Sequence, residues 1–289
     1  MNYEITGNTR LTALLGSPVA HSISPQMHNE AFRQLGLDYV YLAFDVSPDT
    51  LEDAVKGLKA AGICGFNLTM PLKVHILPLI DELTPAARLA GAVNTVMVKD
   101  GRLIGHTTDG VGYMHSVSDA GYNIIGRKMT LLGSGGAATA ICVQAALDGV
   151  ASIDMFKRKN ASWDKTMEFC TRTSSETGCQ IRLLDFYDTE LLAKSISESA
   201  ILTNATSLGM APDIGASPIP VPAMLHQNLI VSDIIYNPRE TLLMKQAQSR
   251  GCRCFNGLYM LLYQGAAAFT CWTGLKMPIE IIKRKYFSN

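Results

Sequence analysis

Residues 129–138 read Met-Thr-Leu-Leu-Gly-Ser-Gly-Gly-Ala-Ala, and this stretch decides the fold of the second half of the chain. An apolar strand pattern runs directly into Gly133 and Gly135, and a helical pattern follows. The spacing is the G-x-G-x-x-A form of a dinucleotide-binding loop. Gly133 permits the tight turn, Gly135 lets the backbone approach a pyrophosphate, and the helix N-terminus supplies N–H groups. A glycine-rich turn without any ligand has the same pattern, so the loop alone leaves both interpretations open.

From Asp109 onward the sequence alternates strictly between strand and helix patterns. Such alternation predicts a parallel sheet with helices on both faces. The predicted strands cover 128–132, 151–156, 180–184, 200–204 and 229–233, and the predicted helices cover 136–149, 161–177, 188–198 and 240–250.

The first 107 residues form a second α/β pattern. Ser24-Pro25 predicts a helix start with Ser24 as the N-cap, and Asp100-Gly101 between two strand-like runs predicts a hairpin. We expect a lobe of residues 1–107 and a dinucleotide-binding domain of 108–258. The last helices, about 259–289, are expected to pack back on the first lobe.

Composition narrows the class of protein. The 289 residues are 47% hydrophobic and carry 25 basic and 25 acidic side chains, so nothing favours a nucleic-acid partner. Two uncharged windows, 129–147 and 254–275, are interpreted as buried helices and not as membrane spans. The polar stretch Met1–Arg10 shows no signal-peptide pattern. Seven cysteines without a C-x-x-C pair indicate a reducing cytoplasm and no structural metal.

The strand predicted at 151–156 ends in Lys157-Arg158-Lys159-Asn160, and Lys157 lies 24 residues past Gly133. An acid here would accept hydrogen bonds from the ribose of NAD, whereas basic residues accommodate the 2′-phosphate of NADP. The pattern therefore favours NADP without excluding NAD. A solvated loop whose charges contact nothing is the alternative.

Polar residues at the ends of apolar elements suggest a second site. Ser22 and Ser24 precede a helix, where hydroxyl and N–H groups can bind a carboxylate. Lys73 is predicted in the first turn of a helix, where a cation is unfavourable, and such violations tend to mark sites. With Asn94 and Asp109, Lys73 would supply a cation, an amide and an acid. A lysine beside a carboxylate is suited to moving a hydroxyl proton during hydride transfer.

Six motifs in order give the chain a resemblance to the shikimate dehydrogenase family, and more closely to its quinate/shikimate dehydrogenase branch. They are Ser22-Ile23-Ser24-Pro25, Asn67-Leu68-Thr69-Met70-Pro71-Leu72-Lys73, Gly91-Ala92-Val93-Asn94-Thr95, Thr108-Asp109-Gly110, Gly133-Ser134-Gly135-Gly136-Ala137, and Asn256-Gly257 through Gln264-Gly265-Ala266. The resemblance implies a substrate lobe followed by a Rossmann-type domain. It also implies reversible, NAD(P)-dependent interconversion of shikimate and 3-dehydroshikimate, and in this branch of quinate and 3-dehydroquinate.

The resemblance also implies roles for individual residues. Lys73 would be the main acid–base residue with Asp109 as its partner, and Ser22 and Ser24 would hold the substrate carboxylate. Thr69, Lys73, Asn94, Asp109 and Gln264 would bind ring hydroxyls, and Tyr236 could also face the substrate. The cofactor would contact Gly133, Ser134, Gly135, Gly136, Ala137, Lys157, Arg158, Lys159, Asn160, Ser207, Ile234, Ile235, Tyr236, Asn237 and Gly257. A monomer or homodimer is expected.

Three positions depart from the family pattern. Ser134 replaces an alanine, the basic loop lacks the acid that favours NAD, and Leu72 precedes Lys73 where many relatives carry Asn or His. Two other functions fit the sequence. One is a different dehydrogenase of the same plan, such as one related to methylenetetrahydrofolate dehydrogenases, and the other is a cofactor-sensing protein without turnover. The paired serines favour a small carboxylate over a folate, and a sensor would not need Lys73 and Asp109.

Overall fold

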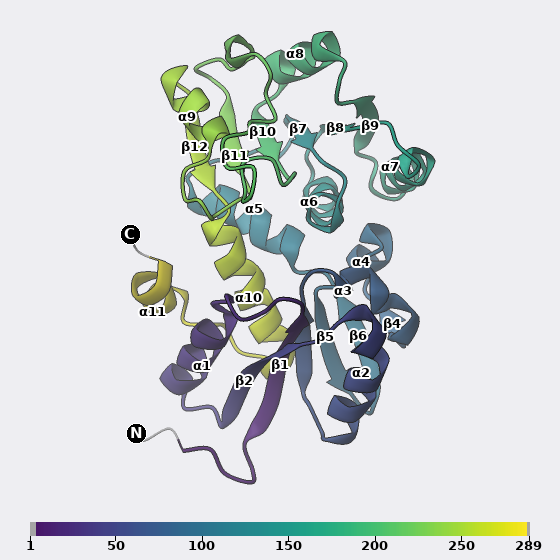
Figure 1. Cartoon of the computed structure of the whole chain (residues 1–289), viewed down its shortest axis with the longest axis vertical. Helices are drawn as coiled ribbons and strands as arrows, with labels where there is room; N and C mark the ends of the chain where they lie inside the picture. Colours follow the sequence, from purple (N-terminus) through teal and green to yellow (C-terminus); the bar gives the residue numbers. More distant parts are fainter. Residues whose placement is uncertain (1–3, 288–289) are drawn as a thin grey trace. The chain divides into compact units, whose positions relative to one another are not determined.

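The computed structural model describes residues 4–287, which divide into two compact units. The first runs to Gly112 and resumes at Leu262, and the second is Tyr113–Leu261 (Figure 1). Two helices, α5 (Asp109–Asp119) and α10 (Leu258–Thr273), each contribute residues to both units.

The second unit is a parallel sheet in the order β12-β11-β10-β7-β8-β9. This order is that of a doubly wound, Rossmann-type fold, as the alternation of strands and helices predicts. The strands are β7 (Lys128–Leu132), β8 (Ser152–Lys157), β9 (Gln180–Asp185), β10 (Ile201–Asn204), β11 (Ile230–Asp233) and β12 (Arg253–Asn256). The connecting helices are α6 (Gly136–Leu147), α7 (Trp163–Thr177), α8 (Thr189–Glu198) and α9 (Leu242–Ser249).

Strands and helices together build the apolar core of the second unit. Leu132, Phe156, Leu202 and Val231 come from four different strands, and Leu192 of α8 belongs to the same buried cluster. Residues 211–222, which hold four prolines, lie outside the regular elements apart from a short 3-10 turn at Pro222–Met224. The carboxyl ends of all six strands meet at one edge, which is where doubly wound sheets bind ligands.

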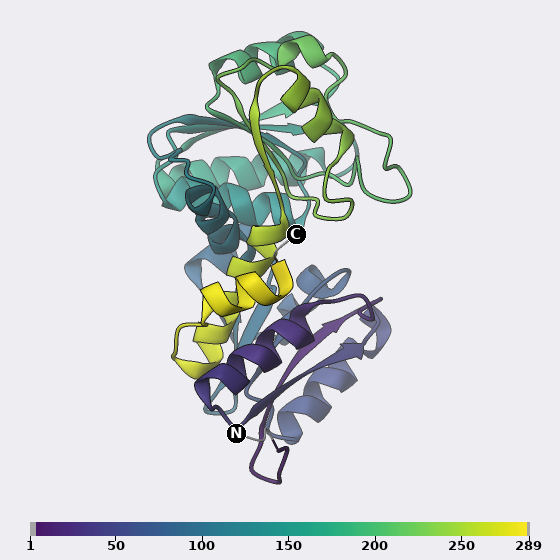
Figure 2. The same ribbon diagram turned by 90° about the vertical axis from the view of Figure 1, so that its left-hand side faces the viewer.

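The first unit holds a mixed sheet in the order β2-β1-β3-β5-β6-β4. Its strands are β1 (Arg10–Gly16), β2 (Tyr39–Asp45), β3 (Gly65–Leu68), β4 (Glu82–Leu83), β5 (Thr95–Lys99) and β6 (Arg102–His106). Its helices include α1 (Ser24–Leu35), α2 (Leu51–Ala60), α3 (Leu72–His75), α4 (Pro85–Ala90) and α11 (Ile279–Ile282). Figure 2 shows the C-terminal helix α11 beside α1. The two-residue strand β4 has no apolar alternation and was not predicted.

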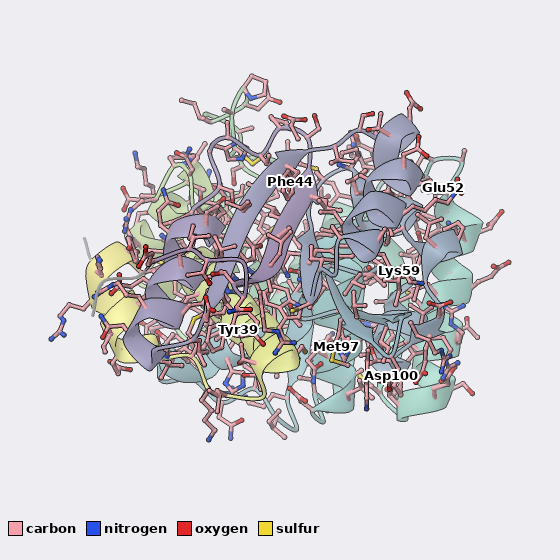
Figure 3. All side chains as sticks on the ribbon, turned by 90° about the horizontal axis from the view of Figure 1, so that it is seen from below. Tyr39, Phe44, Glu52, Lys59, Met97 and Asp100 are labelled. Atoms are coloured by element: carbon pink, nitrogen blue, oxygen red, sulfur yellow. The ribbon has the colours of Figure 1, made fainter. Side chains whose placement is uncertain are left out.

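The hairpin between β5 and β6 forms as predicted. Asp100 and Gly101 both adopt positive φ angles, 51° and 72°. Two consecutive residues of this kind make the turn whose twist matches that of paired strands. Figure 3 labels Asp100 in this turn and Met97 on β5, and it marks the edge strand β2 with Tyr39 and Phe44.

The prediction that Ser24 caps α1 is wrong. The N-cap position is Ile23, Ser24 is the first helical residue, and no side chain caps the helix. The Ser22 hydroxyl instead accepts the Ser24 N–H at 3.2 Å. The Ser24 side chain is buried, and its hydroxyl opposes the rise in the pKa of Tyr41 that burial causes. The Ser24 side chain therefore contributes to the polar interior of the unit instead of capping its helix.

Both uncharged windows form helices and strands of the two α/β units. Within residues 4–287, no helix is long and apolar enough to cross a membrane.

One buried carboxylate joins three elements of the second unit. Asp154 on β8 is 1% exposed and accepts two hydrogen bonds from Arg182, at 2.7 Å each, and one from Ser195 at 2.8 Å. Lys128 Nζ lies 2.8 Å from the same carboxylate. Burial alone would raise the pKa of Asp154, but the hydrogen bonds from Arg182, Lys128 and Ser195 outweigh it, so its pKa is lowered.

We expect Asp154→Asn to lower the free energy of unfolding by about 2–3 kcal/mol at pH 7, because two cations lose their buried partner. A lowered pKa stabilises the fold above the ordinary Asp pKa, and this contribution is lost as the pH falls through the lowered value. The difference between the variant and the natural protein should therefore shrink in acid. Urea denaturation at pH 7 and at acid pH measures it, with the exposed Glu168→Gln as control. An equal difference at both pH values would contradict the assignment.

Candidate functional site

The polar centre of the first unit is organised by Asn94, which is 2% exposed. Its Oδ1 accepts the Thr108 N–H at 2.7 Å. Its Nδ2 donates to Thr108 Oγ1 at 2.9 Å, to Asp109 Oδ1 at 2.8 Å and to Gln264 Oε1 at 3.3 Å. One side chain thus joins the start of β5, the start of α5 and helix α10.

Lys73 and Asp109 form a close ion pair in this centre. Lys73 Nζ lies 2.6 Å from Asp109 Oδ2, and the two side chains are 23% and 9% exposed. The Lys73 carbonyl accepts the Val93 N–H at 2.9 Å, which ties α3 to the segment that carries Asn94. The cation predicted in the first turn of a helix is therefore balanced by a carboxylate from another element. The helix itself, α3, is only four residues long.

A hydrogen-bonded chain leads from this pair to the predicted carboxylate site. Asn67 Nδ2 donates to the Asn94 carbonyl at 3.1 Å and to Thr95 Oγ1 at 2.9 Å. Asn67 Oδ1 accepts from the Tyr41 hydroxyl at 2.8 Å. The Ser24 hydroxyl opposes the burial that raises the pKa of Tyr41, which puts Ser24 beside this phenol. Hydrogen bonds therefore connect Tyr41 through Asn67 and Asn94 to the Lys73–Asp109 pair. Tyr41 was missed because its position in an apolar strand reads as a core residue.

A neutral histidine packs against the ring of Tyr41. The His28 ring stacks on the Tyr41 ring with centroids 4.4 Å apart and an interplanar angle of 11°. Burial lowers the pKa of His28 to about 3, so the ring is uncharged at neutral pH. The stack fixes the plane of the Tyr41 ring and with it the direction of the hydroxyl.

The other residues predicted for substrate contact fall into two groups. Ser22, Thr69 and Gln264 lie in the first unit, and Gly16 leaves room for the Thr69 methyl group, which a Cβ at Gly16 would approach to 2.2 Å. Tyr236 lies in the second unit. The departure at Leu72 has a simple cause, since its side chain is fully buried in the apolar core and does not extend the polar centre.

The second unit holds a cavity of about 610 Å³ at the carboxyl edge of its sheet. Loops after four neighbouring strands form it. The lining residues are Gly133, Ser134, Gly135, Phe156, Lys157, Arg158, Asn160, Phe186, Tyr187, Ala205, Thr206, Ser207, Leu208 and Asp213. The predicted cofactor residues Gly136, Ala137, Lys159, Ile234, Ile235, Tyr236, Asn237 and Gly257 are not part of this lining.

The glycine loop fits a dinucleotide for two reasons. Gly133 has a φ of +108°, and a Cβ there would lie 2.7 Å from the Ala205 carbonyl oxygen, whereas a Cβ on Gly135 would meet nothing within 4 Å. Gly135 is the N-cap of α6, and no side chain caps this helix. The first-turn N–H groups therefore face an open loop, as an anion site requires.

Only one of the three predicted cations lines the cavity without another partner among residues 4–287. Lys157 Nζ is held by Asn160 Oδ1 at 2.8 Å and Ser162 Oγ at 2.6 Å, and burial and then the Arg158 charge lower its pKa. Lys159 Nζ lies 3.6 Å from Asp185 Oδ2 and over the Trp163 ring. Arg158 is exposed, lines the cavity and has no ion pair within the described part of the chain.

Gly257 has a structural reason to be glycine. A Cβ on it would lie 1.9 Å from the Ile234 carbonyl oxygen, and its N–H donates to the Ile235 carbonyl at 3.2 Å. This close approach joins the ends of β11 and β12. Phe186, Tyr187, Thr206 and Asp213 were missed as lining residues, because only the fold brings their loops to the cavity. No group of three or more potential metal ligands occurs among the residues that the structure describes.

Comparison with known proteins decides the family. One family model, the shikimate dehydrogenase substrate binding domain, matches residues 14–96, and another, the shikimate 5′-dehydrogenase C-terminal domain, matches residues 257–285. A shikimate dehydrogenase (NADP(+)) of Listeria monocytogenes serotype 4b is 51% identical over 287 residues, which cover 98% of each chain. This chain belongs to the shikimate dehydrogenase family.

Solved structures of family members have the same fold. The shikimate 5-dehydrogenase from Listeria monocytogenes in complex with shikimate and NAD matches with a TM-score of 0.94 and 50% identity, over 98% of both chains. The quinate dehydrogenase from Corynebacterium glutamicum in complex with NAD matches with a TM-score of 0.85 and 26% identity, over 97% of this chain and 99% of that one. The family resemblance seen in the six motifs is confirmed.

The two glycines of the loop should respond differently to substitution. We expect Gly133→Ala to cost about 2–4 kcal/mol of stability, because it adds a carbonyl contact to a strained φ angle. Gly135→Ala should leave the melting temperature within about 2 °C, since its Cβ enters open space. Thermal unfolding followed by circular dichroism measures both. Equal melting temperatures for the two variants would contradict this account of Gly133.

Proposed function

We propose that this protein is a shikimate dehydrogenase that converts shikimate and NADP⁺ reversibly into 3-dehydroshikimate, NADPH and a proton. The observation that carries the proposal is the Lys73–Asp109 pair, held at 2.6 Å in a network that continues through Asn94 and Asn67 to Tyr41. The shikimate dehydrogenase of Listeria, half identical over nearly the whole chain, supports it. Shikimate is a small ring with a carboxylate and several hydroxyls. Its carboxylate would match the serine hydroxyls, and one of its ring hydroxyls would match the Lys73–Asp109 pair.

The residues of the first unit would divide the work on the substrate. The hydroxyls of Ser22 and Ser24 would donate to the carboxylate, and the amides of Asn94 and Gln264 would bind ring hydroxyls. This arrangement fixes which hydroxyl lies against Lys73. Positioning of this kind contributes to the rate because the reacting atoms are held in place before the reaction starts.

Oxidation requires the loss of a proton and of a hydride from the same alcohol. The Lys73 amine would accept the hydroxyl proton as the C–O bond becomes a carbonyl, and Asp109 would hold the lysine nitrogen in place. A bound nicotinamide ring supplies the acceptor for the electron pair and hydrogen of the adjacent C–H bond. In the reverse direction the Lys73 ammonium would return the proton to the carbonyl oxygen.

Quinate is the second substrate that we propose. It has the carboxylate and ring hydroxyls that the network addresses, and a quinate dehydrogenase shares this fold. We further propose that the protein acts in the cytoplasm as a monomer or homodimer. Its seven cysteines, all within the described residues, are free thiols, which suits a reducing compartment.

The decisive experiment measures initial rates with shikimate or quinate against NAD⁺ or NADP⁺. We expect the highest kcat/KM with shikimate and NADP⁺. Activity on a folate alone would overturn the proposed substrate. Tight NADP⁺ binding without turnover of shikimate or quinate would indicate a cofactor sensor instead.

Lys73→Ala should lower kcat by about 10²–10⁴-fold, the usual contribution of a general acid–base residue. The melting temperature should change little, because the lysine lies at the edge of the polar centre and not in the apolar core. Lys59→Ala, an exposed lysine of the same unit, is the matched control and should be fully active. Near-normal turnover by Lys73→Ala would rule out its catalytic role.

Arg158→Ala should raise the KM for NADP⁺ by about 10–100-fold and leave the KM for NAD⁺ within about twofold, because only NADP⁺ carries the 2′-phosphate. Lys159→Ala is the control, since that ammonium contacts Asp185 and Trp163. It should keep the KM for NADP⁺ within about threefold. A larger effect of Lys159→Ala than of Arg158→Ala would refute this interpretation of the loop.

A further inference from the structure

An exposed tyrosine lines the cofactor cavity at a place that the loop motifs do not explain. Tyr187 follows β9 and is 70% exposed, as much as any large hydrophobic side chain in the described residues. It nevertheless belongs to the lining of the 610 Å³ cavity. A large ring left open to solvent inside a cavity is a surface available for a ligand.

Tyr187 is held in place by its neighbours. Asp185 Oδ1 accepts the Tyr187 N–H at 3.2 Å, and the Phe186 N–H donates to the Lys157 carbonyl at 3.0 Å. The Phe186 ring packs on the apolar core and meets the Tyr187 ring edge to face, with centroids 6.0 Å apart and an interplanar angle of 86°. These contacts fix the backbone at Tyr187 and support one edge of its ring, so less conformational freedom is lost on ligand binding than for an unsupported side chain.

The order of the strands places Tyr187 at one end of the cavity. The glycine loop follows β7, Arg158 and Asn160 follow β8, and Tyr187 follows β9, with β8 between the other two strands. In a dinucleotide-binding fold the pyrophosphate lies on the glycine loop and the adenosine ribose at the next strand end. The adenine base then extends beyond the ribose, toward the third loop.

We propose that Tyr187 binds the adenine base of the cofactor by stacking its ring on the base. The inference rests on the proposed function, since it takes NADP⁺ as the dinucleotide. Adenine is a flat aromatic ring system, and such bases gain affinity from aromatic side chains regardless of hydrogen bonding. Arg158 and Tyr187 then have separate tasks: Arg158 binds the 2′-phosphate, and Tyr187 binds the base that NAD⁺ and NADP⁺ share.

Isothermal titration calorimetry on the full chain tests this with two fragments, adenosine 2′,5′-bisphosphate and 5′-AMP. Tyr187→Ala should raise the Kd of both fragments by a similar factor, about 5–100-fold, the usual effect of removing a base-stacking ring. Tyr187→Phe, the matched control, keeps the ring and should bind both within about twofold. Arg158→Ala should weaken only the bisphosphate, because 5′-AMP has no 2′-phosphate.

The outcomes separate the inference from the proposed function. Unchanged Kd values in Tyr187→Ala, with its melting temperature intact, would overturn the role of Tyr187 even if the enzyme oxidises shikimate. A loss in Tyr187→Phe as large as in Tyr187→Ala would also overturn it, because a stacking ring does not need the hydroxyl. Fragment binding that depends on the Tyr187 ring, in a protein that oxidises neither shikimate nor quinate, would support the inference and refute the proposed substrates.

Discussion

The hydrogen bond from the Thr108 N–H to Asn94 Oδ1 is the constraint on which the polar centre of the first unit depends. It determines which end of the Asn94 amide points toward the following helix, so that Nδ2 must face Asp109 Oδ1. With one carboxylate oxygen bound by the amide, the other is left for Lys73. Because Asn94 is almost fully buried, a rotated amide would leave its polar atoms without hydrogen-bond partners. The cost in free energy would be similar to the destabilisation that a typical point mutation causes. One backbone N–H thereby orients the Lys73–Asp109 ion pair.

The second unit also has a buried polar side chain that bonds to the residues following its central strands. Asp233 on β11 is fully buried, and its Oδ1 accepts from Asn204 Nδ2 at 3.1 Å and from the Ile235 N–H at 3.1 Å. Its Oδ2 accepts from Thr241 Oγ1 at 2.8 Å. Burial raises the pKa of this carboxyl group against the opposing effect of these hydrogen bonds. In both units, a buried polar side chain at a strand end sets the course of the loops that follow, which is where doubly wound folds carry their sites.

The sequence predicts whatever depends on local pattern. The alternation after Asp109 and the Asp100-Gly101 turn have a period or a dipeptide as their cause, and both were found at the expected residues. Contacts between side chains from distant segments cannot be predicted from local pattern. The Tyr41 hydroxyl meets Asn67, and Lys157 turns onto Asn160 and Ser162, only because the chain has already folded around them. The same limit applies to Ser24, which is buried as the first helical residue where local rules predict a helix cap.

The basic loop after β8 shows why counting charges in a motif overstates what they do. Lys157 and Lys159 are as cationic as Arg158 in the sequence, but each already has partners within the loop or on a neighbouring strand. Their hydrogen bonds and ion pair shape the loop, so their removal would alter its conformation before it altered the charge available to a ligand. Arg158 lines the cavity and has no ion pair in the described chain. Its guanidinium suits a phosphate because it can donate two parallel hydrogen bonds. In the function that we propose, discrimination between NAD⁺ and NADP⁺ therefore depends on Arg158, while the glycine loop and Tyr187 address the parts that both dinucleotides share.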